Sequence, residues 1–273
     1  MGFTIGGIRG TKEPRSGDRS GTRGTAGETG DSGSRWARDT DRGTRQAAKE
    51  DRDRNPGQPR EYKEPRAAVR RRRAAASECG TAVAEYTGLW GWAVVPGARA
   101  QDGRCSCGVP DCAAPGAHPL DFAPEVPAGA TLDEATRAWG HFPGAAVMLP
   151  VGRAFDVIEV AETAGRRALV RLERMGVPLG PVTATPEGRT HFLVAPGAAA
   201  ELPQLLYRMG WDDAALDLGA LGPGAYITAP PSDRGGLGPV RWLRAPDPDS
   251  ATHPPHARLL LGTLAYVAHR SPG

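Results

Sequence analysis

The stretch that decides the fold is Phe155-Asp156-Val157-Ile158-Glu159-Val160, a hydrophobic run that leads almost directly into helix-forming sequence. Its branched and aromatic side chains are typical of a buried strand. The segment that follows has Thr163 as a candidate helix cap and repeats apolar residues at helical spacing as far as Met175. Gly176 then ends the pattern. A strand joined to a helix in this way predicts a domain in which helices cover a sheet.

The same mixture of strands and helices extends outward on both sides. Upstream we expect a helix from Ser77 to about residue 89, a strand over 92–96, and a helix from Thr131 to about Gly140 that opens with a capping box. A further strand over 145–149 precedes the one at 155–160. Downstream, the patterns predict strands at 181–185, 190–195, 214–218, 225–229 and 239–243, and helices at 198–209 and 256–269. The fold class is therefore α/β or α+β with one core.

Charge divides the chain into two regions. Residues 1–73 hold 19 Lys+Arg and 11 Asp+Glu, a net of +8, whereas the whole chain has 34 and 31, a net of +3, so residues 74–273 carry −5. Residues 1–76 have few aliphatic side chains and no periodicity, which predicts a disordered charged tail before a domain over 77–273. The run Arg70–Arg73 indicates contact with nucleic acid or an acidic protein, and the alternative is a solvated or untranslated extension.

The domain contains no lysine, which weighs against strong non-specific DNA binding. There is no secretory signal and no apolar stretch long enough to cross a bilayer, so we expect a cytoplasmic protein without membrane contact.

Cysteine spacing gives the most specific local signal, within a loop at about 103–119. Three thiols and one imidazole follow the pattern Cys105-x-Cys107-x4-Cys112-x5-His118. These ligand types match a closed, four-coordinate structural zinc site. The alternative is a reduced, partly exposed Cys loop, and the remaining thiol, Cys79, is expected to be an ordinary buried side chain.

A second, dispersed signal comes from polar residues on hydrophobic strands. Glu159, His191 and Asp217 each lie in a predicted strand or beside one. Carboxylates that converge on neighbouring strands can hold Mg²⁺ or Mn²⁺ for nucleotidyl transfer. The alternative is that each is an isolated edge or surface residue.

The order of motifs resembles the bifunctional DNA primase/polymerase (Prim-Pol) N-terminal domain over nearly all of 80–245. The resemblance lies in the succession of Gly91-Trp92-Ala93-Val94-Val95-Pro96, the Cys/His loop ending at His118-Pro119, Ala138-Trp139, an acidic strand, Gly188 to His191, Leu216-Asp217-Leu218, and Ala229-Pro230-Pro231-Ser232. It implies a primase–polymerase-like fold with an RRM-like mixed sheet flanked by helices, and metal-dependent DNA or RNA synthesis.

Carried over residue by residue, the resemblance makes Glu159 the first metal-binding acid, Asp217 the third, and His191 a contact of the incoming nucleotide. Arg189 and Ser232 become candidate nucleotide-binding residues. The second acid falls on Ala161, a departure from the family pattern. Residues two apart on a strand face the same side, so Ala161 leaves a gap beside Glu159.

Three functions follow as expectations. The first is a degenerate primase/polymerase-like domain that binds nucleotide, and DNA as a further partner, with structural zinc and with Mg²⁺ or Mn²⁺ when nucleotide is bound. The second is an active nucleotidyltransferase that synthesises primers or extends DNA. The third is a non-catalytic protein-interaction or regulatory domain. Fold alone does not separate them, because function is a property of the site.

Overall fold

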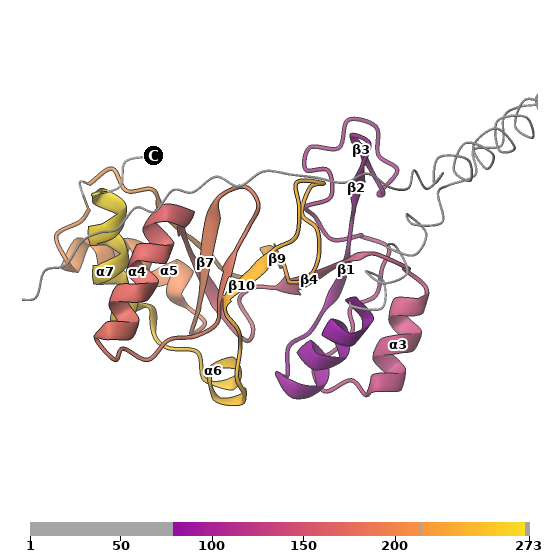
Figure 1. Ribbon diagram of the computed structural model, residues 1–273, viewed down its shortest axis with the longest axis horizontal. Helices are drawn as coiled ribbons and strands as arrows, with labels where there is room; N and C mark the ends of the chain where they lie inside the picture. The colour runs from indigo at the N-terminus through magenta and orange to yellow at the C-terminus, as the bar shows by residue number, and fades with distance from the viewer. Residues whose placement is uncertain (1–78, 213, 271–273) are drawn as a thin grey trace, which may run out of the picture. The chain divides into compact units, whose positions relative to one another are not determined.

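The computed structural model describes residues 79–212 and 214–270 (Figure 1). The predicted tail over 1–76, its arginine run at 70–73 and the helix cap at Ser77 lie outside the described residues.

A five-stranded sheet forms the main frame, with the strand order β10-β6-β7-β5-β8. Its strands are β5 (Asp156–Ala161), β6 (Val182–Ala184), β7 (Arg189–Val194), β8 (Leu218–Leu221) and β10 (Arg241–Arg244). Helix α4 (Glu162–Arg174) connects β5 to β6, and α5 (Ala198–Arg208) connects β7 to β8. The succession β5-α4-β6-β7-α5-β8 is the split βαβ arrangement of ferredoxin-like and RRM-like sheets. The predicted α/β class with helices against a sheet is confirmed.

The sheet differs from the expectation in one respect, because its strand pairs are all antiparallel rather than mixed. The cause is the path of the chain. After helix α4 the chain forms β6, which runs parallel to β5 but is not its direct neighbour. The β6–β7 hairpin then places β7 between β5 and β6, antiparallel to both. β5 and β6 are therefore separated by an antiparallel neighbour.

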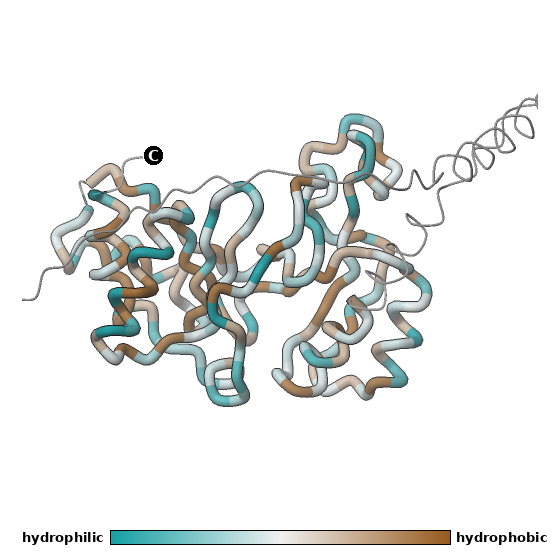
Figure 2. The backbone as a smooth tube through the Cα atoms, viewed as in Figure 1, coloured by the Kyte–Doolittle hydropathy of each residue, from teal (hydrophilic) through white to brown (hydrophobic). Residues whose placement is uncertain are grey.

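Three helices, namely α4, α5 and the C-terminal helix α7 (Ala257–His269), cover one face of this sheet. Helix α7 packs beside α4, as Figure 1 shows, and both contact the side of β5 that carries Ile158 and Val160. Hydrophilic and hydrophobic residues are interleaved along α4 (Figure 2), as an amphipathic helix requires. Ala168 and Leu172 of its apolar stripe are buried, whereas Met175 at its end is exposed. The opposite face of β5 carries Val157 and Glu159, while Ala161, at the end of the strand, is the N-cap of α4 and packs against this helical cluster.

A smaller antiparallel sheet, ordered β1-β4-β9, forms the second half of the domain. Its strands are β1 (Val95–Gly97), β4 (Ala146–Pro150) and β9 (Tyr226–Thr228). It packs on the N-terminal helix, which covers 79–84 and continues as the π-helix η1 (Glu85–Leu89), and on α3 (Leu132–Gly140). The capping box at Thr131 is confirmed.

Aromatic side chains concentrate in this second core. Tyr86 and Trp92 are stacked with centroids 6.0 Å apart, and Phe155 meets Trp92 edge-on at 5.1 Å. Val157 of β5 and Leu193 of β7 belong to the same cluster, so this core continues onto one end of the five-stranded sheet. The cluster therefore ties the open face of β5 to the smaller sheet.

Several predicted elements need correction. The strand expected over 92–96 is β1 at Val95–Gly97, and the one expected over 214–218 begins only at Leu218. The strands expected at 145–149 and 155–160 form, but β4 and β5 belong to different sheets, because a turn at Gly152 (φ +94°) lies between them. The short strands β2 (Ala100–Gln101) and β3 (Arg104–Cys105) and the helix α6 (Pro248–Thr252) were not predicted.

The expected cap of α4 at Thr163 was wrong. The helix begins at Glu162 with Ala161 as its N-cap, and no side chain caps it. Instead, the Glu162 N–H donates to the Gly188 carbonyl at 2.7 Å, so a tertiary contact replaces the local cap. The expected stop is confirmed, since Gly176 has φ +66°. Within the described ranges, none of the helices has the length and apolar character needed to cross a membrane.

Candidate functional site

Four charged or polar side chains converge on the open face of the five-stranded sheet. Strand pairing places Glu159 of β5 directly opposite His191 of β7, and Ala161 opposite Arg189. On the other side of β5, Glu159 pairs with Gly219 of β8, which follows Asp217 closely in the chain. Opposite residues in an antiparallel pair share a face, so the register brings the candidate residues Glu159, His191 and Arg189 together.

Hydrogen bonds and ion pairs connect these side chains into one network. The Glu159 carboxylate receives a bond from Arg189 Nε at 3.2 Å and lies 3.0 Å from His191 Nε2. Arg189 Nη1 donates to both carboxylate oxygens of Asp217, at 2.8 and 2.7 Å. One guanidinium thus bridges both acids of the site. Sequence inspection had given Arg189 a separate nucleotide-binding role and had missed this bridge.

The electrostatics of the network favour an ionised Glu159. The hydrogen bond from His191 is the main cause that lowers the pKa of Glu159, burial opposes it, and the charge of Arg189 adds to the lowering. The bond to Asp217 raises the pKa of the Arg189 guanidinium, with a further contribution from Glu159. The Glu159 and Asp217 side chains keep 30% and 46% of their surface exposed, so solvent reaches both acids. A ligand can therefore reach them too.

Ala161 brings no carboxylate to the site, at the position where the resemblance implied a second acid. It lies at the end of β5 on the same face as Glu159. Glu162 does not take the place of that acid, because its carboxylate pairs with Arg166 at 2.7 Å and lies 3.9 Å from Arg241. The two remaining acids are both bonded to Arg189. As arranged, the carboxylate oxygens are bonded to a guanidinium, so a divalent cation could bind them only in competition with Arg189.

Buried polar atoms lie beside the network. His191 is almost fully buried, and its Nδ1 atom has no hydrogen-bond partner among the described residues. Thr183 of β6 pairs directly with His191, and its buried hydroxyl is also without a partner there. Such atoms are costly to leave unsatisfied.

Ser232, the other candidate nucleotide-binding residue, lies apart from this network. Its hydroxyl is buried, accepts a hydrogen bond from the Val147 N–H at 2.7 Å and lies 4.0 Å from Cys79 Sγ. These contacts tie the loop after β9 to β4. Within the described ranges, no hydrogen bond connects Ser232 to Glu159 or Arg189.

The Cys/His loop forms a second, separate cluster. The ligand atoms of Cys105, Cys107, Cys112 and His118 all lie within 4.8 Å of one another, so the group could hold a metal ion. His118 Nε2 lies 3.3 Å from both Cys105 Sγ and Cys112 Sγ. Its Nδ1 lies 2.7 Å from the Pro119 carbonyl, a partner that leaves Nε2 as the ligand atom facing the thiols.

The loop backbone supports thiolate formation at Cys105. Burial alone would raise the pKa of the Cys105 thiol, but backbone N–H groups of Cys107 and Gly116, with His118, lower it to about 6. The Gly116 N–H donates to Cys105 Sγ at 3.4 Å. Gly116 has φ +69°, and a Cβ there would lie 2.4 Å from the Ala100 nitrogen, so the turn requires glycine. A thiolate is the form that binds metal.

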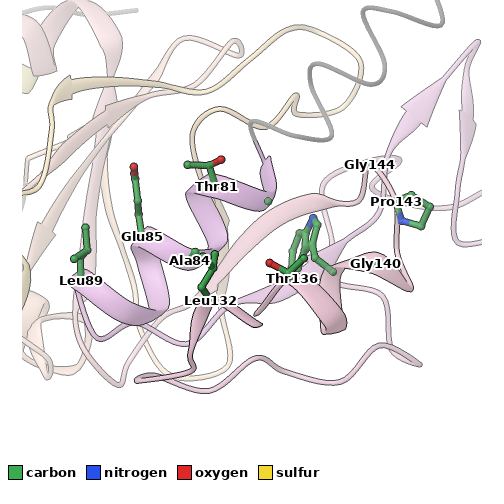
Figure 3. Close-up of a pocket in the computed structure, with 11 residues that line it drawn as sticks. Thr81, Ala84, Glu85, Leu89, Leu132, Thr136, Gly140, Pro143 and Gly144 are labelled. Atoms are coloured by element: carbon green, nitrogen blue, oxygen red, sulfur yellow. The ribbon is translucent and has the colours of Figure 1, made fainter. Parts of the chain in front are cut away.

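An apolar cavity of about 690 Å³ opens between the N-terminal helix and α3 (Figure 3). Its lining includes Thr81, Glu85 and Leu89 from the first helix, and Leu132 and Thr136 from α3. Leu89 and Leu132 are both largely exposed. No local sequence pattern indicated this cavity, because it depends on how the two helices pack.

The comparisons agree with this geometry. Residues 83–257 match the family described as bifunctional DNA primase/polymerase, N-terminal. The chain therefore belongs to the Prim-Pol family, whose members are primase/polymerase-like nucleotidyltransferase modules that depend on metal and act on nucleotides and nucleic acid. No curated protein and no solved structure gives a significant match.

Proposed function

We propose that this domain is a degenerate Prim-Pol module that binds a nucleotide on the open face of the five-stranded sheet and does not synthesise primers efficiently. One observation carries the proposal: Glu159, Arg189, His191 and Asp217 form a single network, while Ala161 stands at the position of the second acid. The residues expected to contact nucleotide thus lie together, whereas one of the three acids expected to hold two metal ions is absent from its expected position.

The chemistry of the site supports binding over transfer. Nucleotidyl transfer with two metal ions needs a clamp of carboxylates around both ions. Two carboxylates can at most contribute to one ion, with phosphates and waters completing its octahedron. We therefore propose that Mg²⁺ or Mn²⁺ accompanies a bound nucleotide and is not resident. Arg189 supplies a guanidinium suited to phosphate oxygens.

The Cys/His cluster is proposed as a structural zinc site held by Cys105, Cys107, Cys112 and His118. Three thiols and one imidazole are a donor set that zinc prefers, and four protein ligands leave no open position for a substrate. The ion would stabilise a loop that otherwise depends on the two-residue strands β2 and β3. We assign it no catalytic part.

The test is to measure nucleotide binding and synthesis side by side. The natural chain should bind a fluorescent deoxynucleoside triphosphate saturably in Mn²⁺, and Glu159→Ala and Asp217→Ala should weaken that binding. Primer synthesis and extension in Mn²⁺ should stay near background. Glu125→Ala is the matched control, because Glu125 forms an exposed ion pair with Arg153 at 2.6 Å.

An active nucleotidyltransferase is the second candidate, favoured by the convergence of Glu159, His191 and Asp217 on one face. Robust synthesis by the natural chain, abolished by both alanine variants and kept by the control, would establish it and refute the degenerate proposal. Absence of saturable nucleotide binding would refute both.

A further inference from the structure

We propose that Arg189 is the resident cation of the acidic site, occupying the charge position between Glu159 and Asp217, and that it passes to the phosphates when a metal-bound nucleotide arrives. The inference rests on the proposed nucleotide-binding function. It adds a specific role for Arg189, namely that of a built-in competitor of the metal ion.

The contacts argue for this role. Arg189 meets both acids with separate nitrogens, Nε with Glu159 and Nη1 with Asp217. The Nη1 bonds, at 2.7 and 2.8 Å, have the short distances of charge-assisted pairs. Each acid therefore already has a positive partner. A divalent ion that binds either acid must first break an ion pair.

The strand register explains why the guanidinium lies there. Arg189 is directly opposite Ala161, and its side chain is on the face that Glu159 and His191 share. A small residue at position 161 leaves the Arg189 side chain a path along the sheet to both acids. The small side chain at position 161 and the bridging Arg189 thus belong to one cross-strand pair.

The net charge of the network is consistent with Arg189 acting as its resident cation. With both acids ionised and Arg189 charged, the network carries a net charge of −1, compared with −2 for the acids alone. A lone divalent ion is attracted less strongly to this network than to two acids without the guanidinium. A metal-bound nucleoside triphosphate would supply a new partner to each side of these ion pairs. Its metal would take the place of the guanidinium at the acids, and its phosphates would accept hydrogen bonds from the guanidinium. Metal and nucleotide should consequently bind cooperatively.

The experiment measures Mn²⁺ alone and Mn²⁺ with dATP on the full chain, by paramagnetic resonance of free Mn²⁺ and by calorimetry. Arg189→Met removes the cation at nearly unchanged length, and Arg189→Lys keeps the charge. Arg153→Met is the control, because Arg153 forms an exposed ion pair outside the site. Arg189→Met should raise the affinity for Mn²⁺ alone by about tenfold, since two partly exposed ion pairs are lost. It should also weaken binding of dATP in Mn²⁺.

The outcomes separate the two proposals. An affinity for Mn²⁺ alone that is the same in Arg189→Met and the natural chain overturns the resident-cation role, whatever the nucleotide result. A higher Mn²⁺ affinity with unchanged dATP binding overturns the transfer to phosphate. Arg189→Lys should keep Mn²⁺ binding low, and a Lys variant that behaves like Met overturns the charge argument. If the natural chain binds no dATP, the proposed function fails while the Mn²⁺ comparison still decides the role of Arg189.

Discussion

Replacing Cys105 with serine should release the metal of the Cys/His cluster and unfold the loop around it. Cys105 contacts His118 at 3.3 Å and accepts from the Gly116 N–H at 3.4 Å, so it lies at the centre of the cluster. Serine is a poor ligand for zinc because its hydroxyl is not ionised near neutral pH. The expected result is a chain without zinc and with a mobile loop, while the two sheets keep their fold.

The size of the effect follows from how little else orders this loop. Between Cys105 and His118, Gly116 is the one buried residue, so apolar burial contributes little. Ordering a residue costs about 1 kcal/mol or more, which over residues 105–118 amounts to about 14 kcal/mol. Zinc binding contributes about 10–16 kcal/mol in small zinc modules, which is the same size. Metal and loop order should therefore be lost together.

The assay combines elemental analysis with limited trypsin digestion. The natural chain should carry about one zinc ion and resist cleavage after the exposed Arg104, whereas Cys105→Ser and chelator-treated protein should be cut there. Cys79→Ala is the matched control, since Cys79 lies in the core beside Ser232 and outside the cluster. Natural protein purified without chelator and lacking zinc would refute the reasoning, as would a Cys105→Ser chain that keeps both metal and protease resistance.

Three further outcomes are expected. Ala161→Asp restores a carboxylate beside Glu159 and should raise the Mn²⁺ affinity measured by calorimetry; no change would mean that position 161 does not face the site. Asp156→Ala should lower the free energy of unfolding by about 1–3 kcal/mol, because the buried Asp156 carboxylate accepts from the Gly197 and Ala199 N–H groups at 3.0 and 2.9 Å; denaturant titration at neutral pH checks it. The pKa of Glu159 is lowered in the folded state, so its stabilisation is present above about pH 4.5 and is lost as the pH falls through the folded pKa. The stability difference between the natural chain and Glu159→Gln, on the order of 1 kcal/mol for a partly exposed pair, should therefore shrink as the pH falls from about 4.5 through the lower, folded pKa. A difference that stays constant over that range would contradict this.

The sequence predicted the fold where the signal was local. The apolar run at 155–160, the Thr131 capping box and the Gly176 stop each depend on neighbouring residues, and each is found in the structure. The start of α4 was wrong because its first N–H finds the Gly188 carbonyl across the fold. No local pattern encodes such a contact.

The sequence predicted which residues form the site, but not how they are bonded to one another. The order of motifs shared with the family led us to expect Glu159, His191 and Asp217 in one site. Alternation along a strand puts Arg189 on the same face as His191. The bridge from Arg189 to both acids depends on the pairing of Ala161 with Arg189, which is a property of β5–β7 register. Register is fixed by the whole sheet, and so the bridge was missed.

The position of β5 in the chain has a consequence for synthesis on the ribosome. Both strands that pair with it, β7 and β8, are translated later. At roughly 5–20 residues per second, Val194 follows Ala161 by roughly 2–7 s. During that interval an apolar strand is made that has no partner. Asp156 and Glu159 put a negative charge on each of its two faces. Charges placed in this way discourage identical strands on neighbouring nascent chains from pairing. We therefore expect Glu159 to disfavour aggregation of the unfinished chain, independently of any role at the site.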